Sequence, residues 1–129
     1  MAVSGEFGVE TPRIAMTWEL KVRQIGTVVL IDAIGRLETS GGSDALEEKL
    51  QGLIREGKRS LVLECSRVSS IDSSGIGALV RCVISLHHRG GALKLLRLSP
   101  VMRSSLKVLG LIERIDSFDD EASALASFK

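Results

Sequence analysis

The chain has 129 residues, of which 44% are hydrophobic and 26% are charged, and its formal net charge is +1. This composition excludes a disordered or fibrous chain, and the near-neutral charge argues against a polyanionic partner. Only 3% of the residues are aromatic and none is Tyr, so direct nucleic-acid binding by base stacking is not expected.

Residues 1–17 mix Gly, Pro and polar residues without a period, so we expect a flexible N-terminal extension there and one domain over residues 18–129. The extension lacks a basic start followed by an apolar run, and every apolar stretch of the chain is too short to span a bilayer. We therefore expect a cytoplasmic protein that does not interact with a membrane.

Two strands are predicted at the start of the domain. Alternating residues 18–23 form the first, a β-branched run over residues 27–34 forms the second, and Gly26 joins them. Gly35 is expected to end the second strand, because glycine weakens a strand interior.

A helix is expected to open at residues 41–43, with Ser43 or Asp44 as its N-cap. Its apolar stripe consists of Ala45, Leu46, Leu50, Leu53 and Ile54. The short apolar run 60–64 then predicts a buried parallel strand, and the polar residues 66–74 after it predict a turn.

The strongest helical period of the chain runs from about Ser74 to the residue before Gly90. Its repeating residues are Ile76, Leu79, Val80, Val83, Ile84 and His87. A strand is predicted over residues 92–98. Ser99 and Pro100 then form a cap and a first helical residue, with Met102, Leu106 and Leu109 on the apolar side of that helix.

The chain is predicted to close with a short strand at residues 115–118 and a helix that Asp119 or Asp120 caps. The resulting order, ββαβαβαβα, predicts a single α/β domain with a mixed, mostly parallel sheet and helices packed on it. Cys65 and Cys82 fall inside apolar patterns, so we interpret both as core residues.

The charges are distributed unevenly, because residues 73–112 contain no Asp or Glu. The six Lys and Arg residues there are Arg81, Arg89, Lys94, Arg97, Arg103 and Lys107. They are interpreted as the solvated faces of helices, or else as a surface for an acidic partner.

A candidate site lies at residues 72–77, Asp-Ser-Ser-Gly-Ile-Gly, where the predicted turn enters the strongest helix. Free N–H groups and the helix dipole favour an anion at a helix N-terminus, so a phosphate on a serine there would be accommodated. Considered alone, these residues indicate ordinary capping, since Asp and Ser are common N-caps.

The surrounding residues point to a family. The apolar strand before residue 72, the Asp72–Gly75 turn, Leu-Ser-Pro at 98–100 and Leu-Gly-Leu at 109–111 together resemble the sulfate transporter and anti-sigma factor antagonist (STAS) family. The sequence Gly-Arg-Leu-Glu at 35–38 resembles that family's Gly-x-Leu-Asp, with Glu38 in place of Asp. The resemblance is greatest to its free-standing anti-sigma factor antagonists.

This resemblance implies a partner switch. It implies that an ATP-dependent serine kinase, itself an anti-sigma factor, phosphorylates Ser73, and that a PP2C-type phosphatase reverses the reaction. Asp72 and Glu38 would then shape the electrostatics of the turn. The adjoining partner-binding surface would comprise Ser74, Gly75, Ile76 and Gly77.

No other motif indicates chemistry, so we expect neither an enzyme nor a cofactor or metal site. The residues 52–59 nearly match a P-loop, but Arg59 stands where Ser or Thr must bind magnesium. His87 and His88 are adjacent on a helix and point in different directions. Two alternative functions remain open, a constitutive scaffold or sensor-complex subunit of the same family and a small nucleotide-binding module.

Overall fold

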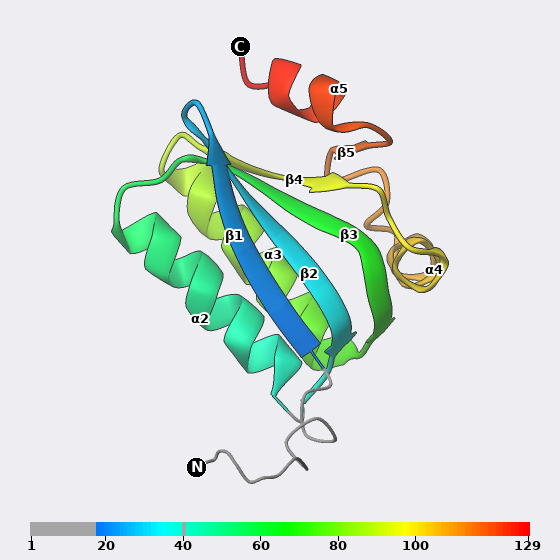
Figure 1. Cartoon of the computed structure of the whole chain (residues 1–129). Coiled ribbons are helices and arrows are strands. Elements are labelled where there is room, and N and C mark those ends of the chain that lie inside the picture. Colours follow the sequence, from blue (N-terminus) through cyan, green and yellow to red (C-terminus); the bar gives the residue numbers. More distant parts are fainter. Residues whose placement is uncertain (1–17, 40) are drawn as a thin grey trace, which may run out of the picture.

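The computed structural model describes residues 18–39 and 41–129, and the extension expected at residues 1–17 lies outside them (Figure 1). The elements follow the predicted ββαβαβαβα order, which confirms the α/β fold class. In chain order they are β1 (Trp18–Ile25), β2 (Val28–Leu37), α2 (Gly42–Arg55), β3 (Ser60–Ile71), α3 (Ser73–His88), β4 (Ala92–Leu96), α4 (Pro100–Val108), β5 (Ser117–Phe118) and α5 (Glu121–Ala126).

The five strands form one sheet in the order β1-β2-β3-β4-β5. β1 pairs with β2 antiparallel, and all later pairs are parallel. Each new parallel strand is therefore added on the same side of the previous one. Crossovers of a single hand then place their helices on one face of the sheet, and α2 and α3 lie together behind it in Figure 1.

The main core fills the space between the sheet and these helices. β2 sends alternate side chains such as Val29 and Ile31 into it, and α2 contributes Leu46 and Leu50, all of them nearly or fully buried. The side chains of Cys65 and Cys82 are fully buried in the same cluster, which confirms their prediction as core residues. Burial also raises the pKa of the Cys82 thiol to about 12.

The opposite face of the sheet carries a smaller core beneath α5. Val28, Leu30, Val62 and Leu96 point to this side and pack with Ala124 of α5. Lys94 Nζ helps to hold the chain end there, because it donates to the Ser127 carbonyl at 3.1 Å and lies 4.5 Å from the centre of the Phe128 ring. α5 covers only part of this face, and the rest carries polar side chains.

Both strands next to the candidate site are longer than predicted. Gly35 does not end β2. It adopts φ +97° at an irregularity in the pairing with β3, and the strand continues to Leu37. The polar residues after Cys65 form strand rather than turn, because they pair with this continuation of β2, as Leu37 does with Ile71.

The buried face of α3 is also rotated relative to the prediction. Ile76 and Leu79 are buried as expected, whereas Ile84 is 50% exposed and His87 is exposed. Cys82 and Leu86 take their places in the core. The apolar residues of this helix extend almost around it, so their spacing alone did not identify the side that meets the sheet.

Several predicted helix and strand ends can be compared directly. Ser99 caps α4 by accepting from the Met102 amide, and Asp120 caps α5 through the Ser123 amide, as predicted. β4 ends at Leu96, two residues before the predicted end. Leu109, expected on the apolar side of α4, is 57% exposed because it follows the last helical residue.

Ser43 and Asp44 do not cap α2. The N-cap is Gly41, and the Ser43 hydroxyl instead donates to the Glu38 carbonyl at 2.9 Å. Within the described ranges 18–39 and 41–129, no helix combines the length and the apolar character needed to cross a bilayer.

The rotated face of α3 gives a stability prediction. Replacing the fully buried Leu86 with Ala should lower the free energy of unfolding by about 2–5 kcal/mol, because it leaves a cavity. The half-exposed Ile84→Ala is the matched control and should change it by about 0.5 kcal/mol or less. Urea unfolding of both variants measures the difference, and equal losses would contradict this packing.

Candidate functional site

The candidate site lies where two chain segments meet at the carboxyl ends of β2 and β3. One segment, residues 37–43, leaves β2 and enters α2, and the other, residues 71–75, leaves β3 and enters α3. The Asp72 amide donates to the Leu37 carbonyl at 3.3 Å and so begins the contact between them.

The carboxylate of Asp72 joins the two segments. One oxygen accepts from the amides of Ser74 and Gly75 at 3.0 and 3.1 Å, which is N-capping of α3. The other accepts from both the amide and the hydroxyl of Thr39 at 3.0 Å. These bonds, led by the one from the Ser74 hydroxyl, hold the pKa of Asp72 well below its usual range.

The two serines of the turn differ sharply in their surroundings. The hydroxyl of Ser74 donates to Asp72, and its oxygen lies 2.8 Å from Ser43 Oγ and 3.2 Å from Thr39 Oγ1. Ser73, the first residue of α3, is exposed. Within the part of the chain that the structure describes, its hydroxyl forms no hydrogen bond. Ser74 is therefore a structural residue, whereas Ser73 is available to another molecule.

Two glycines follow the serines, Gly75 and Gly77, and they differ in how much room there is for a side chain. A Cβ on Gly75 would lie 2.4 Å from the Leu37 carbonyl oxygen and 2.7 Å from the Ile71 side chain, so only glycine fits. A Cβ on Gly77 would meet only the movable end of Arg81, at 3.1 Å. Ile76 between them is 8% exposed and belongs to the main core, so its side chain offers little surface.

Glu38, the remaining predicted site residue, faces β3 rather than the turn. Its carboxylate accepts from the Ser70 hydroxyl at 2.7 Å and lies 3.4 Å from Arg36 Nε. Among the described residues it has no hydrogen bond with Asp72 or Ser73. Its backbone carbonyl, however, accepts from Ser43 and so helps to shape the loop beside the turn.

Thr39 and Ser43 are site residues that the sequence analysis missed. Both lie in the segment after β2, and both reach the Asp72–Ser74 turn through their side chains. Their position carried a signal, because the carboxyl ends of adjacent parallel strands meet at one edge of a sheet. This rule could therefore have identified polar residues after β2 as neighbours of those after β3.

Most of the basic residues between 73 and 112 form hydrogen bonds or ion pairs with other residues of this chain. Arg81 forms two hydrogen bonds of 2.7 Å with Glu47 of α2, and Arg97 Nε contacts Glu64 at 2.7 Å. Arg89 donates to Ser85 on its own helix. Within the described ranges, no three His, Cys, Asp or Glu side chains form a group that could hold a metal ion.

Comparisons with known proteins agree with this geometry. The model of the STAS domain family matches residues 19–124, and the chain belongs to this family. A protein of Bordetella bronchiseptica named as a candidate anti-sigma factor antagonist, BtrV, is 26% identical to it over 101 residues, which are 78% of this chain and 87% of that protein.

Solved structures have the same fold. An anti-sigma factor antagonist from Mycobacterium paratuberculosis superposes with a TM-score of 0.77 and 18% identity, covering 85% of this chain and 92% of that chain. The Bacillus cell fate determinant SpoIIAA in its phosphorylated form gives a TM-score of 0.69 and 23% identity, covering 86% and 100%. At these identities the likeness establishes the fold.

The contact at Gly75 predicts a strict requirement for glycine. Gly75→Ala should destabilise the protein by about 1–3 kcal/mol or more, because its Cβ would overlap backbone that cannot move freely. Gly77→Ala is the matched control on the same helix and should be tolerated, since Arg81 can shift. Thermal unfolding tests the pair, and a Gly75→Ala protein as stable as Gly77→Ala would refute the close approach.

The hydrogen bonds to Asp72 predict that the stability of the folded protein depends on pH. The pKa of Asp72 is lower in the folded protein than in the unfolded chain, where it is about 3.9. The ionised carboxylate therefore stabilises the folded state above that pH. This stabilisation is lost as the pH falls through the pKa of the folded state. Asp72→Asn keeps a capping side chain without the charge. We expect wild type to be more stable than Asp72→Asn at neutral pH, with the difference shrinking in acid, as measured by urea unfolding. A difference that stays constant into acid would contradict this.

Proposed function

We propose that this chain is an anti-sigma factor antagonist whose binding to an ATP-dependent anti-sigma factor serine kinase is controlled by phosphorylation of Ser73. In this proposal the unphosphorylated protein binds the kinase, so that the sigma factor is released to act in transcription. Phosphorylation of Ser73 ends the binding, and a PP2C-type phosphatase restores it. The protein acts in the cytoplasm as a binding protein.

The different environments of the two serines carry the proposal. A kinase needs an accessible hydroxyl, and Ser73 is exposed at the first position of α3. Ser74 is a poor acceptor by comparison, because its hydroxyl is engaged with Asp72 and lies beside the buried Ser43. The rigid capping of α3 by Asp72 would present Ser73 in one defined position.

Electrostatics supports a switch at this position. A phosphate would bring about −1.5 to −2 charges beside Asp72, whose carboxylate stays ionised because its pKa is lowered. A negative group of a docked partner roughly 5 Å from the phosphate would be repelled by about 3 kcal/mol at an effective dielectric of 20, which is roughly a hundredfold in affinity. The α3 dipole would stabilise the phosphate itself, so the change would act on a docked acidic surface rather than on the fold.

The similar proteins support the same assignment. BtrV and the Mycobacterium paratuberculosis protein are described as anti-sigma factor antagonists, the former as a candidate one. SpoIIAA is known in a phosphorylated form, so this fold accommodates the modification in that protein.

Variants of Ser73 test the proposal. With the kinase identified as a histidine-kinase-like ATPase encoded beside this protein, Ser73→Ala should bind as wild type does and accept no phosphate. Ser73→Asp should bind at least about tenfold more weakly, because it places a negative charge in the proposed contact with the kinase. Calorimetry measures the affinities, and mass spectrometry after incubation with ATP locates the phosphate.

The neighbouring hydroxyl at residue 74 provides the control. Ser74→Ala should still be phosphorylated at Ser73, although it loses hydrogen bonds to the turn and should be less stable. Equal kinase affinity of Ser73→Ala and Ser73→Asp would exclude the switch. Binding to the kinase without phosphate on Ser73 would instead indicate a constitutive scaffold.

A further inference from the structure

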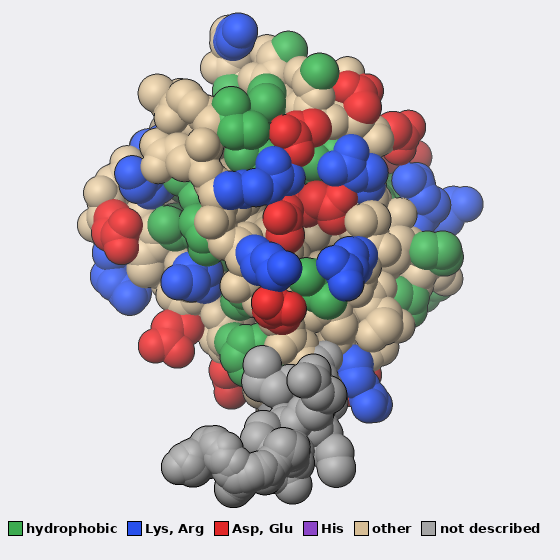
Figure 2. Space-filling model, in the orientation of Figure 1, with side chains coloured by type: hydrophobic (Ala, Val, Ile, Leu, Met, Phe, Trp, Pro, Cys, Tyr) green, Lys and Arg blue, Asp and Glu red, His purple; other side chains and the backbone are tan. Residues whose placement is uncertain are grey.

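The face of the sheet that carries no crossover helix holds a charged hollow beside α5. It has a volume of about 200 Å³ and is lined by side chains of β1, β2 and β3 and by Arg97. Figure 2, which shows this face, has basic and acidic side chains close together at its centre. The charged residues lining the hollow are Lys21, Arg23, Arg67 and Arg97 with Asp32 and Glu64.

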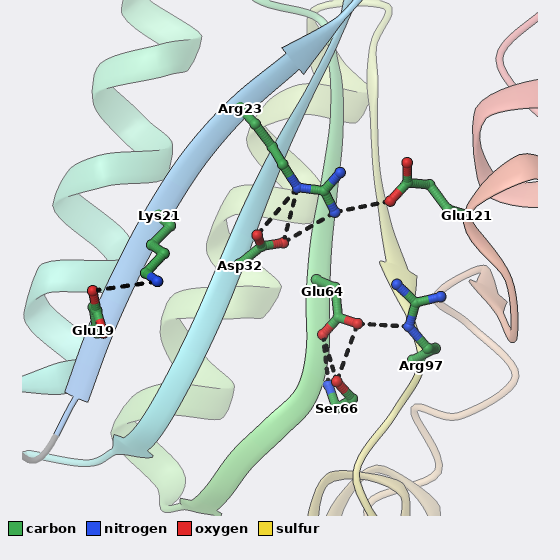
Figure 3. Close-up of polar contacts among 8 residues, drawn as sticks. All are labelled: Glu19, Lys21, Arg23, Asp32, Glu64, Ser66, Arg97 and Glu121. Atoms are coloured by element: carbon green, nitrogen blue, oxygen red, sulfur yellow. Dashed lines mark hydrogen bonds and ion pairs between the residues drawn. The ribbon is translucent and has the colours of Figure 1, made fainter.

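Both carboxylates of the hollow are already neutralised. Arg23 approaches Asp32 through Nε at 3.1 Å and Nη2 at 3.2 Å. The side chain of Glu64 is only 10% exposed and accepts from Arg97 Nε at 2.7 Å and from the Ser66 amide at 2.8 Å (Figure 3). The lining has four basic and two acidic side chains, and Glu121 of α5 also binds Arg23 at 2.8 Å, so the net charge with Glu121 included is one positive.

The excess positive charge is on groups with unused donors. Arg97 contacts Glu64 through Nε, and its two terminal nitrogens form no hydrogen bond within the described residues. Arg67 is exposed and forms no ion pair in that part of the chain. The nearest acid to Lys21 is Glu19 at 3.9 Å, and both side chains are more than half exposed, so this pair is weak.

Arg97, which lines this hollow, has an unusual backbone conformation. Its φ of +51° makes it the one residue other than glycine with a positive φ in ranges 18–39 and 41–129. Its amide donates to the Phe118 carbonyl at 2.8 Å, which anchors the backbone, while Glu64 anchors the side chain. A strained backbone fixed from two sides is typical of a functional position.

We propose that this hollow binds a small dianionic oxyanion, with Arg67, Arg97 and Lys21 as its ligands. Guanidinium groups recognise phosphate and carboxylate oxygens through paired hydrogen bonds. The volume is below the roughly 300–1,000 Å³ of sites for drug-sized ligands. A phosphate ion, a phosphoryl group or a small dicarboxylate fits this size.

Titration of the isotope-labelled protein by NMR tests the site. Inorganic phosphate and malonate, added at constant ionic strength, should each give saturable shifts at the amides of Ile34, Ser66, Arg67 and Arg97, and acetate should not. Tighter binding of phosphate or of malonate distinguishes a phosphoryl ligand from a carboxylate ligand. Absence of saturable shifts with both dianions would overturn the proposal.

Two exposed side chains allow a clean mutational test. Lys21→Ala and Arg67→Ala leave the Asp32 and Glu64 pairs intact, and each should weaken dianion binding by about tenfold or more, as expected for loss of a charged hydrogen bond. Arg103→Ala on α4 removes one charge outside the hollow and should leave binding unchanged.

The experiment also separates this site from the Ser73 turn. Saturable shifts confined to the first residues of α3, or equal affinities of Arg67→Ala and wild type, would overturn the proposal. Neither result would bear on phosphorylation of Ser73, because the titration uses no kinase and the hollow shares no residue with the turn.

Discussion

The arrangement of the candidate site depends on the hydrogen bonds that the Asp72 carboxylate accepts. This carboxylate caps α3 and simultaneously binds Thr39, so the segments after β2 and β3 are held as one unit. The unit can be this compact because Gly75 leaves room for the Leu37 carbonyl. A charged group at the surface thereby acquires a structural role, since its ionised form accepts several hydrogen bonds.

The sheet order determines how the remaining surface is used. Because β2 to β5 follow one another in space as in sequence, α2 and α3 share one face and the main core lies there. The opposite face receives only α5 and retains charged side chains (Figures 1 and 2). The Ser73 turn stands at the carboxyl ends of two strands, while the charged hollow lies nearer their middle. The two regions therefore use different parts of the same strands.

Much of the fold follows from local patterns. The alternation in β1, the apolar run that opens β3, and the caps at Ser99 and Asp120 are local signals, and each predicted element is present. Strand ends were less predictable. Ser66 to Ile71 are mostly polar, and they form a strand because β2 continues past Gly35 and supplies pairing partners that are distant in sequence.

The sequence by itself determined the element order, the family and the turn at residues 72–75, since these depend on capping chemistry and on spacing along the chain. Only the tertiary structure decided which side of α3 is buried and which serine is available. In the folded chain the Ser74 hydroxyl lies within hydrogen-bonding distance of Thr39 and Ser43, whereas Ser73 is exposed. The physical reason is that hydrogen bonding and burial depend on neighbours more than thirty residues away, which a local pattern does not contain.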